Sequence, residues 1–378
     1  MRGSLDMSKG RLHSVFVLVF AVAACGGEDS GVSVASTAPF VVIPTSTSTP
    51  TPTPAPTPTP TPAAPQQTNS LLPFIDNAKI PASEVGFASV RIKPEPSYLP
   101  TQNTDGTGQF RITCTFSHMS YDDPIVYPGK PGATHLHTFF GNTAVDYAST
   151  QSSIERTGNS TCTGGTANRS GYWVPAVIDT KDGTPIKPSK IMVYYKTSYL
   201  EGNNVKPFPA GLRMIAGDMK ASAPQAHIYW ECRKDGDSGP RSSTIPTNCP
   251  VGYIVEANID FPYCWDGVNL DSPDHKSHMS YETQLQSPPF TKMCPASHPV
   301  ELPIISEKVQ YVVTEEGSGA RWRLSSDNYE KTLLGGYSLH ADWFNGWDPK
   351  VQATWIKNCL QANRDCHAFL LGDATTLY

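Results

Sequence analysis

Short segments of alternating character dominate the chain from about residue 81 onward. β-Branched and aromatic residues recur at every second position in several of them. These strand-like segments are residues 87–92, 110–116, 191–195, 227–230 and 309–313. Because successive side chains of a strand point to opposite faces, a period of two predicts half-buried β-strands. The segments are separated by long stretches rich in Pro, Gly, Asn and Ser, which predict extended loops.

One window has helical character, residues 349–362. Asp348 is a suitable N-cap, and Pro349 is suited to the first helical position. No internal repeat or second Pro/Thr-rich stretch divides the region, and a hydrophobic content of 38% is enough for a core. We therefore predict a mainly β, sandwich-like single domain over residues 81–378, with long disulfide-stapled loops and few short helices.

The first 25 residues have the features of a bacterial export signal. Lys9 and Arg11 precede an uncharged apolar run over residues 15–24. Such a run of about ten residues is too short to cross a bilayer, which needs about 20. The sequence therefore predicts export.

The apolar run ends in residues 22–25, Val-Ala-Ala-Cys, which resemble a lipobox. In a lipobox the cysteine thiol, here of Cys25, is lipidated and becomes the start of the mature chain. Ordinary cleavage after Ala24 is the alternative. With Gly26 rather than Asp after the cysteine, we expect anchoring to the cell envelope, at the outer membrane or cell surface, through the lipid.

We predict that residues 26–80 form a disordered Thr/Pro-rich linker. Its centre is a Thr-Pro repeat over residues 49–62. Alternating proline favours polyproline II, which extends by about 3.1 Å per residue. We interpret it as a stalk for the folded domain.

Nine cysteines occur in the chain, and Cys25 is assigned to the lipid. The other eight cysteines are an even number, which in an exported protein predicts disulfides. A zinc site of four thiolates is the alternative, which the lack of any Cys-x-x-Cys pair disfavours. Proximity along the chain suggests the pairs Cys114 with Cys162, Cys232 with Cys249, Cys264 with Cys294, and Cys359 with Cys366.

The charge balance argues against one class of partner. Lys and Arg number 29 and Asp and Glu 34, so the net charge is −5. Nucleic-acid-binding proteins normally have a basic surplus, so we expect no nucleic-acid partner. We also expect a monomer.

Histidines gather in polar and aromatic motifs. His135 and His137 would share one face of a strand, and His275 and His278 would adjoin on a helical turn. We predict that these four bind a metal, with zinc or copper preferred for imidazole ligands. The alternative is that the histidines brace loops by hydrogen bonds. His118, His227, His298 and His367 are assigned to structure.

Carboxylates accompany these histidines. Glycoside hydrolysis needs two carboxyl groups beside the scissile bond. Asp274 and Asp342, with His340, are the predicted acid and base. Asp266 and Asp348 are expected to make turns or caps.

Five strings, in this order along the chain, carry a family resemblance: HLHTFFGN, GYWVPAV, CWDGVNLDSPDHKSHM, CPASHPVELP and LHADWFNGWD. They resemble the DUF1996 family over roughly Glu84 to Cys366. The resemblance implies an extracellular protein. Because some members carry appended carbohydrate-binding modules, it also implies a polysaccharide setting, without a defined reaction.

We therefore expect a surface-displayed protein that binds or processes extracellular glycan at a His/Asp site, as a metal-dependent hydrolase. The alternative is a non-catalytic carbohydrate-binding or adhesin-type envelope protein, and a purely structural envelope protein is a third possibility. In the binding alternative, Trp173, Trp265, Trp343 and Trp347 would form a stacking platform, with Asn142 as a further ligand-binding residue. A concave His/Asp pocket favours the enzyme, and a flat row of exposed Trp favours the binding protein.

Overall fold

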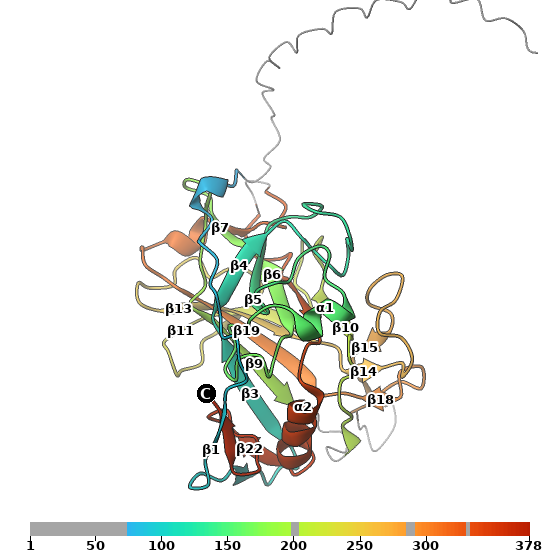
Figure 1. The fold of residues 1–378 in the computed structure, drawn as a ribbon. Coiled ribbons are helices and arrows are strands. Elements are labelled where there is room, and N and C mark those ends of the chain that lie inside the picture. The colour runs from blue at the N-terminus through green and yellow to red at the C-terminus, as the bar shows by residue number, and fades with distance from the viewer. Residues whose placement is uncertain (1–73, 198–203, 285–291, 330–332) are drawn as a thin grey trace, which may run out of the picture. The chain divides into compact units, whose positions relative to one another are not determined.

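The structure is a computed structural model that describes residues 74–197, 204–284, 292–329 and 333–378 (Figure 1). The chain divides into two compact units, Met1–Gln66 and Gln67–Tyr378, and the second is the folded domain described here. The predicted export signal, Cys25 and most of the linker lie outside the described residues. Within those residues, no helix is long and apolar enough to cross a membrane.

The larger of the two main sheets has eight strands. Its neighbours are antiparallel except for one parallel pair, β22 with β3. In spatial order the strands are β12 (Arg241–Ser242), β11 (Ile228–Arg233), β13 (Ile254–Asp260), β19 (Ile304–Val312), β9 (Lys190–Lys196), β3 (Gln109–Cys114), β22 (Arg364–Cys366) and β2 (Thr101–Gln102).

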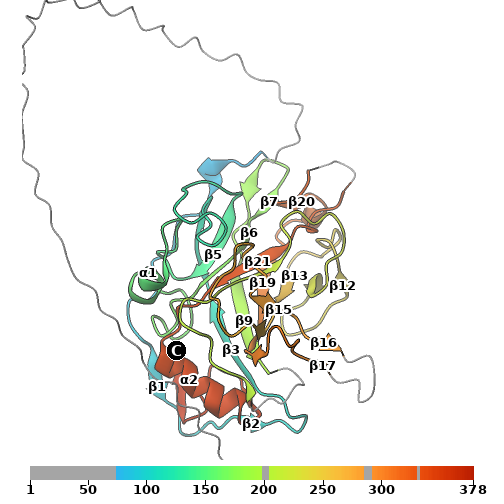
Figure 2. The ribbon, with the colours of Figure 1, turned by 90° about the vertical axis from the view of Figure 1, so that its right-hand side faces the viewer.

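The second sheet has five strands, all antiparallel to their neighbours. In spatial order they are β10 (Arg213–Gly217), β21 (His340–Phe344), β6 (Gly171–Pro175), β5 (His137–Gly141) and β4 (Phe116–Ser120). Because β6 lies between β5 and β21, segments from the two ends of the domain are only one strand apart (Figure 1 and Figure 2).

One hydrophobic core joins the two sheets. In β3 and β9 buried and half-buried residues alternate, with Ile112 and Val193 among those that point inward. From the five-stranded sheet, Phe140, Tyr172 and Trp343 enter the same cluster. The predicted sandwich-like, mainly β domain is therefore confirmed.

The five-stranded sheet is also covered on its outer face. Phe139, Trp173 and Phe344 belong there to a second hydrophobic cluster. That cluster includes Ile125 from the loop after β4 and Ile154 from helix α1 (Gln151–Arg156). Every residue of β5, β6 and β21 is consequently buried. Polar side chains on this face are held away from water.

Smaller elements complete the domain. They are β1 (Ile92–Pro94) with β23 (Thr375–Leu377); β7 (Val177–Asp179), β8 (Thr184–Pro185) and β20 (Trp322–Leu324); β14 (Cys264–Trp265), β15 (Met279–Ser280) and β18 (Val300–Glu301); β16 (Thr283–Gln284) with β17 (Lys292–Met293); and the short 3-10 helices η1 (Asn77–Lys79) and η3 (Ser318–Ala320). Residues 74–80, assigned to the linker from sequence, contain η1, and Ile75 and Ile80 pack against a buried cluster of the domain.

The helix predicted over 349–362 begins where expected and changes form partway. Asp348 accepts hydrogen bonds from the backbone N–H groups of Lys350 and Val351. Helix α2 runs over Pro349–Trp355 and continues as a π-helical turn, Ile356–Leu360. The strand predicted over 87–92 forms only at its last residue, Ile92, which begins β1, whereas Phe87 and Val90 make isolated bridges to loop residues.

Four disulfides staple the loops, and they join the pairs that proximity suggested: Cys114–Cys162, Cys232–Cys249, Cys264–Cys294 and Cys359–Cys366. The last joins the π-helical turn to β22.

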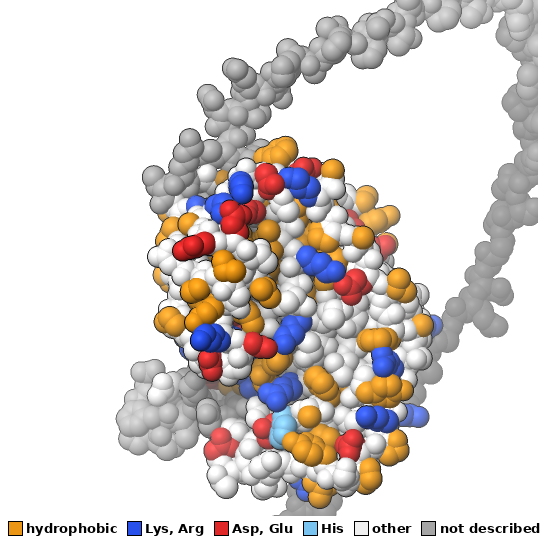
Figure 3. Space-filling model, turned by 90° about the vertical axis from the view of Figure 1, so that its left-hand side faces the viewer, with side chains coloured by type: hydrophobic (Ala, Val, Ile, Leu, Met, Phe, Trp, Pro, Cys, Tyr) orange, Lys and Arg blue, Asp and Glu red, His pale blue; other side chains and the backbone are white. Residues whose placement is uncertain are grey.

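Charges of both signs cover the face of the molecule in Figure 3. Lys and Arg side chains lie beside Asp and Glu, with hydrophobic groups between them. Opposite charges also pair at the surface, as in Lys181 and Glu315, whose Nζ and Oε1 atoms lie 3.3 Å apart. This face presents interspersed charges rather than a field of one sign.

Candidate metal centre

Three histidines converge on the outer face of the five-stranded sheet. His137 begins β5, His340 begins β21, and His135 lies two residues before β5. One ring nitrogen of each lies within 4.8 Å of the others. The ring centroid of His135 lies 4.2 Å from that of His137 and 5.0 Å from that of His340. The strand order β21-β6-β5 brings these positions together.

Hydrogen bonds to main-chain carbonyls orient two of the rings. The Nδ1 atom of His137 lies 3.1 Å from the carbonyl oxygen of Asp122, and that of His340 lies 2.8 Å from the oxygen of Ser338. A carbonyl oxygen only accepts, so in each ring we assign the proton to Nδ1 and the lone pair to Nε2. This is the arrangement by which metal-binding histidines are held.

The free nitrogens face one another. His137 Nε2 lies 3.5 Å from His340 Nε2, and with both protons on Nδ1 neither atom can donate to the other. His135 Nε2 is also buried and has no hydrogen-bond partner among the described residues. A cation between the three nitrogens would satisfy all of them.

Two carboxyl groups adjoin the histidines. Oxygen atoms of Asp123 and Asp342 lie within 4.8 Å of each other and of a ring nitrogen of His137. Asp123 Oδ1 accepts the backbone N–H groups of Ile125 and Val126, both at 2.9 Å. Both oxygens of Asp342 are buried without a hydrogen bond to any described residue. An unpaired buried carboxylate is costly, so this group requires either a proton or a cation.

The electrostatics of the site follow from burial. Desolvation raises the pKa of Asp342 well above its ordinary range, and the charges of Asp123 and Glu307 raise it further. Desolvation also lowers the pKa of His137 to about 3 and that of His340 to about 4. The pKa of His135 is lowered by burial and then by its two histidine neighbours. Neutral imidazoles are the form that binds a metal.

This donor set fits zinc or copper. Both ions accept imidazole nitrogen and carboxylate oxygen, at bond lengths of about 2 Å for zinc. Of the three histidines only His135 is partly exposed, whereas His137 and His340 are buried. Any approach from solvent is therefore on the His135 side.

His275 and His278, predicted as metal ligands, do not join this cluster, and that prediction needs correction. The Nε2 of His278 lies 2.7 Å from the carbonyl oxygen of Arg213, and its Nδ1 lies 3.0 Å from Ser272 Oγ. His275 Nδ1 lies 3.0 Å from Asp271 Oδ1. Both belong to a loop of turns and bends instead of the helical turn assumed, and His275 has a φ of 59°.

That loop nevertheless lies along the rim of the centre. The Lys276 amine donates to the carbonyl oxygen of Gly217, which pairs with His340 in the sheet. The positive charge of Lys276 helps to lower the pKa of His340.

Asp274 is a turn cap rather than a catalytic acid. It is exposed and accepts hydrogen bonds from Ser272 Oγ and from the backbone N–H groups of Lys276 and Ser277. These bonds lower its pKa, with the Ser277 backbone contributing most. Asp266 accepts from the Val268 and Asn269 N–H groups, as expected for a turn. Of the predicted catalytic residues, only Asp342 and His340 lie in the centre.

The tryptophan stacking platform is not formed. Trp173 and Trp343 are 0% exposed and Trp347 is 3% exposed. Only Trp265 is partly exposed, and its indole N–H donates to the carbonyl oxygen of Asn269. The first three lie in or beside a sheet that is buried on both faces, so their rings fill the core.

Asn142 braces a loop instead of facing a ligand. It is buried, and its amide donates to the carbonyl oxygens of Ile154 and Thr157. Its own oxygen accepts from the Ala144 N–H.

The remaining histidines make structural contacts. His118 stacks on Phe139 at a centroid distance of 4.6 Å, and His227 stacks on Tyr281 at 3.9 Å. His298 bonds to the Ser277 carbonyl oxygen, and His367 lies 3.5 Å from Asp365.

Asp123 is the site residue that sequence reasoning missed. Its one signal is the acidic pair of residues 122–123 before Pro124, which is typical of a turn. Only the pairing of β4 with β5 brings this turn beside His137.

Comparisons with known proteins identify the family alone. Neither the curated proteins nor the solved structures give a significant match. The family model described as "Domain of unknown function (DUF1996)" matches residues 123–347, more than half of the chain. The matched span begins at Asp123 and includes all five residues of the centre. The chain belongs to the DUF1996 family.

Proposed function

We propose that this protein holds one zinc or copper ion through the Nε2 atoms of His135, His137 and His340, and that the centre processes extracellular glycan. The observation that carries the metal site is the convergence of three buried ring nitrogens, two of them assigned as unprotonated, beside the carboxyl group of Asp342, which has no hydrogen bond to a described residue. Buried polar atoms normally have partners, so several atoms at one point without a partner among the described residues favour a bound cation.

A zinc or copper ion supplies Lewis acidity for hydrolysis. Asp342 and Asp123 supply the pair of carboxyl groups that acid–base chemistry needs, because their mutual repulsion and burial favour retention of a proton on one of them. The carbonyl oxygens of Asp122 and Ser338 hold His137 and His340 in the ligating tautomer. Partly exposed His135 marks the side from which a substrate would approach.

Glycan as the substrate is supported from outside the centre. The predicted export signal and lipid anchor would hold the domain at the cell envelope, where polysaccharide is abundant. The family resemblance adds a carbohydrate setting. Loss of the tryptophan platform weakens the purely adhesive alternative, because three of its four rings lie in the core.

A structural metal centre is the second candidate. Structural zinc sites are closed, whereas catalytic sites keep an open position. The burial of His137, His340 and Asp342 favours a closed site. In that case the ion would stabilise the fold without turnover.

The test starts with full-length protein loaded with zinc or copper and desalted, followed by elemental analysis. We expect about one ion per chain in the wild type and in His298→Ala, whose histidine lies outside the centre, and little in His137→Ala. Equal metal content in His137→Ala and wild type would remove the proposed site. Hydrolysis of a polysaccharide panel, lost on chelation and in Asp342→Asn, supports the catalytic role. A fall in melting temperature on chelation, without hydrolysis in any sample, supports the structural one.

A further inference from the structure

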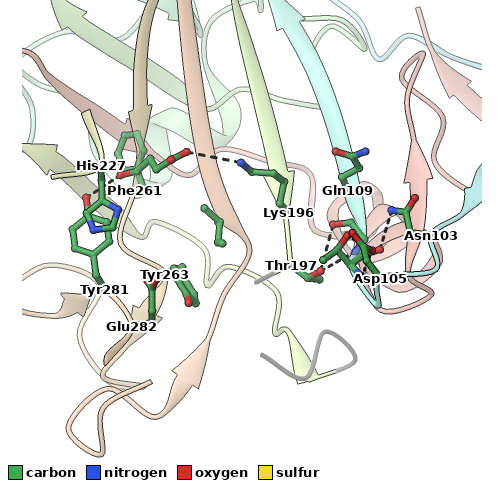
Figure 4. Close-up of a pocket in the computed structure, with 14 residues that line it drawn as sticks. Asn103, Asp105, Gln109, Lys196, Thr197, His227, Phe261, Tyr263, Tyr281 and Glu282 are labelled. Carbon is green, nitrogen blue, oxygen red and sulfur yellow. Dashed lines mark hydrogen bonds and ion pairs between the residues drawn. The ribbon is translucent and has the colours of Figure 1, made fainter. Parts of the chain in front are cut away.

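A cavity of about 490 Å³ lies on the eight-stranded sheet, away from the five strands that carry the metal centre. It is found where β3 begins, β9 ends, β13 ends and β19 begins, and Gln109, Lys196, Asp260 and Ile304 line it there. Figure 4 shows Lys196 between two walls, with Asn103, Asp105 and Thr197 on one side and His227, Phe261 and Tyr281 on the other. None of these residues belongs to the metal centre.

We propose that this cavity is a second binding site, which takes a neutral, polyhydroxylated ligand such as a short oligosaccharide. Its volume lies within the range of small-molecule sites and would hold about two or three sugar rings. The proposal does not rest on the metal centre.

Stacked rings form one wall of the cavity. His227 and Tyr281 lie parallel, with an interplanar angle of 5° and centroids 3.9 Å apart. The Tyr281 hydroxyl donates to the carbonyl oxygen of Asp260, which fixes the ring. His227 has a φ of 64°, a left-handed conformation that is rare and unfavourable for a residue other than glycine. The rigid wall is thus maintained against a backbone cost.

The floor offers polar groups whose hydrogen-bonding capacity is only partly used. The Ser306 hydroxyl donates to Asp260 Oδ1, which leaves Oδ2 as an acceptor. Lys196 Nζ lies 3.9 Å from Asp260 Oδ1, beyond hydrogen-bond length. Burial lowers the pKa of Lys196, the nearby charge of Asp260 opposes that shift, and Lys308 adds to it. Gln109, half-buried, makes no side-chain hydrogen bond to any residue that the structure describes. Its amide can both donate and accept.

The opposite wall is polar and acidic. The Asn103 amide donates to the Thr107 carbonyl oxygen, which leaves its side-chain oxygen as an acceptor. Asp105 Oδ1 accepts the backbone N–H and the hydroxyl of Thr107, which leaves Oδ2.

Charge selects the class of ligand. Asp105, Asp260 and Glu282 oppose an anion, and the central amine of Lys196 opposes a polycation. Hydroxyl groups both donate and accept, so a neutral polyol can pair with the amine, the carboxylates and the amides at once. The apolar face of a sugar ring would pack on the aromatic wall.

Isothermal titration of full-length protein with neutral trisaccharides (cellotriose, xylotriose, laminaritriose, maltotriose and chitotriose) tests the site, with trigalacturonate as the anionic comparison. We expect at least one neutral trisaccharide to bind, and Lys196→Gln to weaken it by more than about tenfold, as loss of a charged hydrogen bond implies. Gln109→Leu, at a side chain without a hydrogen bond to any described residue, should weaken binding severalfold at an unchanged melting temperature.

Chelation and His137→Ala separate this site from the metal centre, because neither should alter trisaccharide affinity. Loss of binding in either would move the ligand to the metal centre and overturn the proposal. It would also be overturned if no neutral trisaccharide binds, if trigalacturonate binds more tightly, or if both cavity variants bind as the wild type does. Failure here would leave metal content, and hence the proposed function, unaffected.

Discussion

The Nε2 atoms of His137 and His340 lie 3.5 Å apart, although the strands that carry them are separated by β6. Each ring is fixed from behind by a carbonyl oxygen, at Asp122 and at Ser338. Neither ring can turn its free nitrogen away without breaking a buried hydrogen bond, so the two lone pairs are held toward one point.

Acidification should affect this centre less than an exposed histidine site. Because burial lowers the pKa of His137 to about 3 and of His340 to about 4, both rings are already neutral at pH 5.5. Protons therefore compete with the metal only below about pH 4, whereas free imidazoles with a pKa of about 6.5 compete from pH 6.5 downward. The rings alone should then change the metal affinity by less than about threefold between pH 7 and pH 5.5. We expect this small change in Asp342→Asn, because in the wild type the ion must also displace the proton that burial holds on Asp342.

Competition with a chromophoric chelator at each pH measures that affinity, and a surface-histidine peptide is the comparison. A tenfold or larger loss at pH 5.5 in Asp342→Asn would contradict the neutral, preorganised cluster.

Replacement of Asp342 by Asn should change the melting temperature in opposite directions with and without metal. Its two oxygens are buried without a hydrogen bond to a described residue, and burial raises its pKa. In metal-free protein Asp342→Asn therefore removes a carboxyl group that ionises readily only in the unfolded chain, and it should raise the melting temperature. In metal-loaded protein the same change removes a negative charge beside the cation and should lower both metal affinity and melting temperature.

Thermal unfolding with and without metal checks this reversal. Asp274→Asn is the matched control, because that carboxyl group lies in an exposed turn. A shift of the same sign in both states would mean that Asp342 does not sense the ion.

Glu307, on β19, should make stability fall as pH rises. It is 0% exposed, neither oxygen has a hydrogen bond to a described residue, and burial raises its pKa well above the ordinary value. Above pH 4.5 the unfolded chain releases this proton, while the native state retains it up to the raised pKa. The native state then binds more protons, so the free energy of unfolding decreases with pH in that window, by up to about 1.4 kcal/mol per pH unit.

Glu307→Gln should remove this contribution and stabilise the protein at pH 7.5 more than at pH 4.5. Urea unfolding of metal-loaded wild type and variant at both pH values gives the difference. Glu315→Gln, an exposed ion-pair residue, is the control. Parallel pH profiles for wild type and Glu307→Gln would show that the carboxyl group is not protonated in the native state.

The disulfides should differ in their contribution to stability. Cys114 and Cys162 are 48 residues apart, whereas Cys359 and Cys366 are 7 apart. Restricting the unfolded chain predicts a contribution of about 4 kcal/mol for the longer loop and about 2 kcal/mol for the shorter. Chemical unfolding of the two double Cys→Ser variants measures both, and a larger loss for the shorter loop would refute the chain-entropy explanation.

Sequence patterns predicted those strands that have one face only half-buried. The alternation in residues 110–116 and 191–195 corresponds to β3 and β9, whose outer faces are only half-buried. Strands β5, β6 and β21 were not among the segments predicted from alternation, because both of their faces are buried and such strands lack a period of two. Their polar motifs were recognised as chemistry instead.

Only some residues of the metal centre were predicted from the sequence. The spacing of His135 with His137 led to two residues that do meet, and His340 and Asp342, predicted as catalytic residues, also lie in the centre. His275 with His278 did not, because i and i+3 adjoin only in a helical turn and this loop is irregular. No local pattern could supply Asp123, which depends on how β4 pairs with β5.

The sequence distance between the ligands has a consequence for assembly. His137 and His340 are 203 residues apart, so closing that loop has a large entropic cost that the folded sheet must already have met. A chain that ends before β21 offers at most two of the three imidazoles and would hold the ion weakly. Capture of the proposed metal would therefore be a late event, and metal content would distinguish complete, correctly joined molecules from fragments that are merely compact.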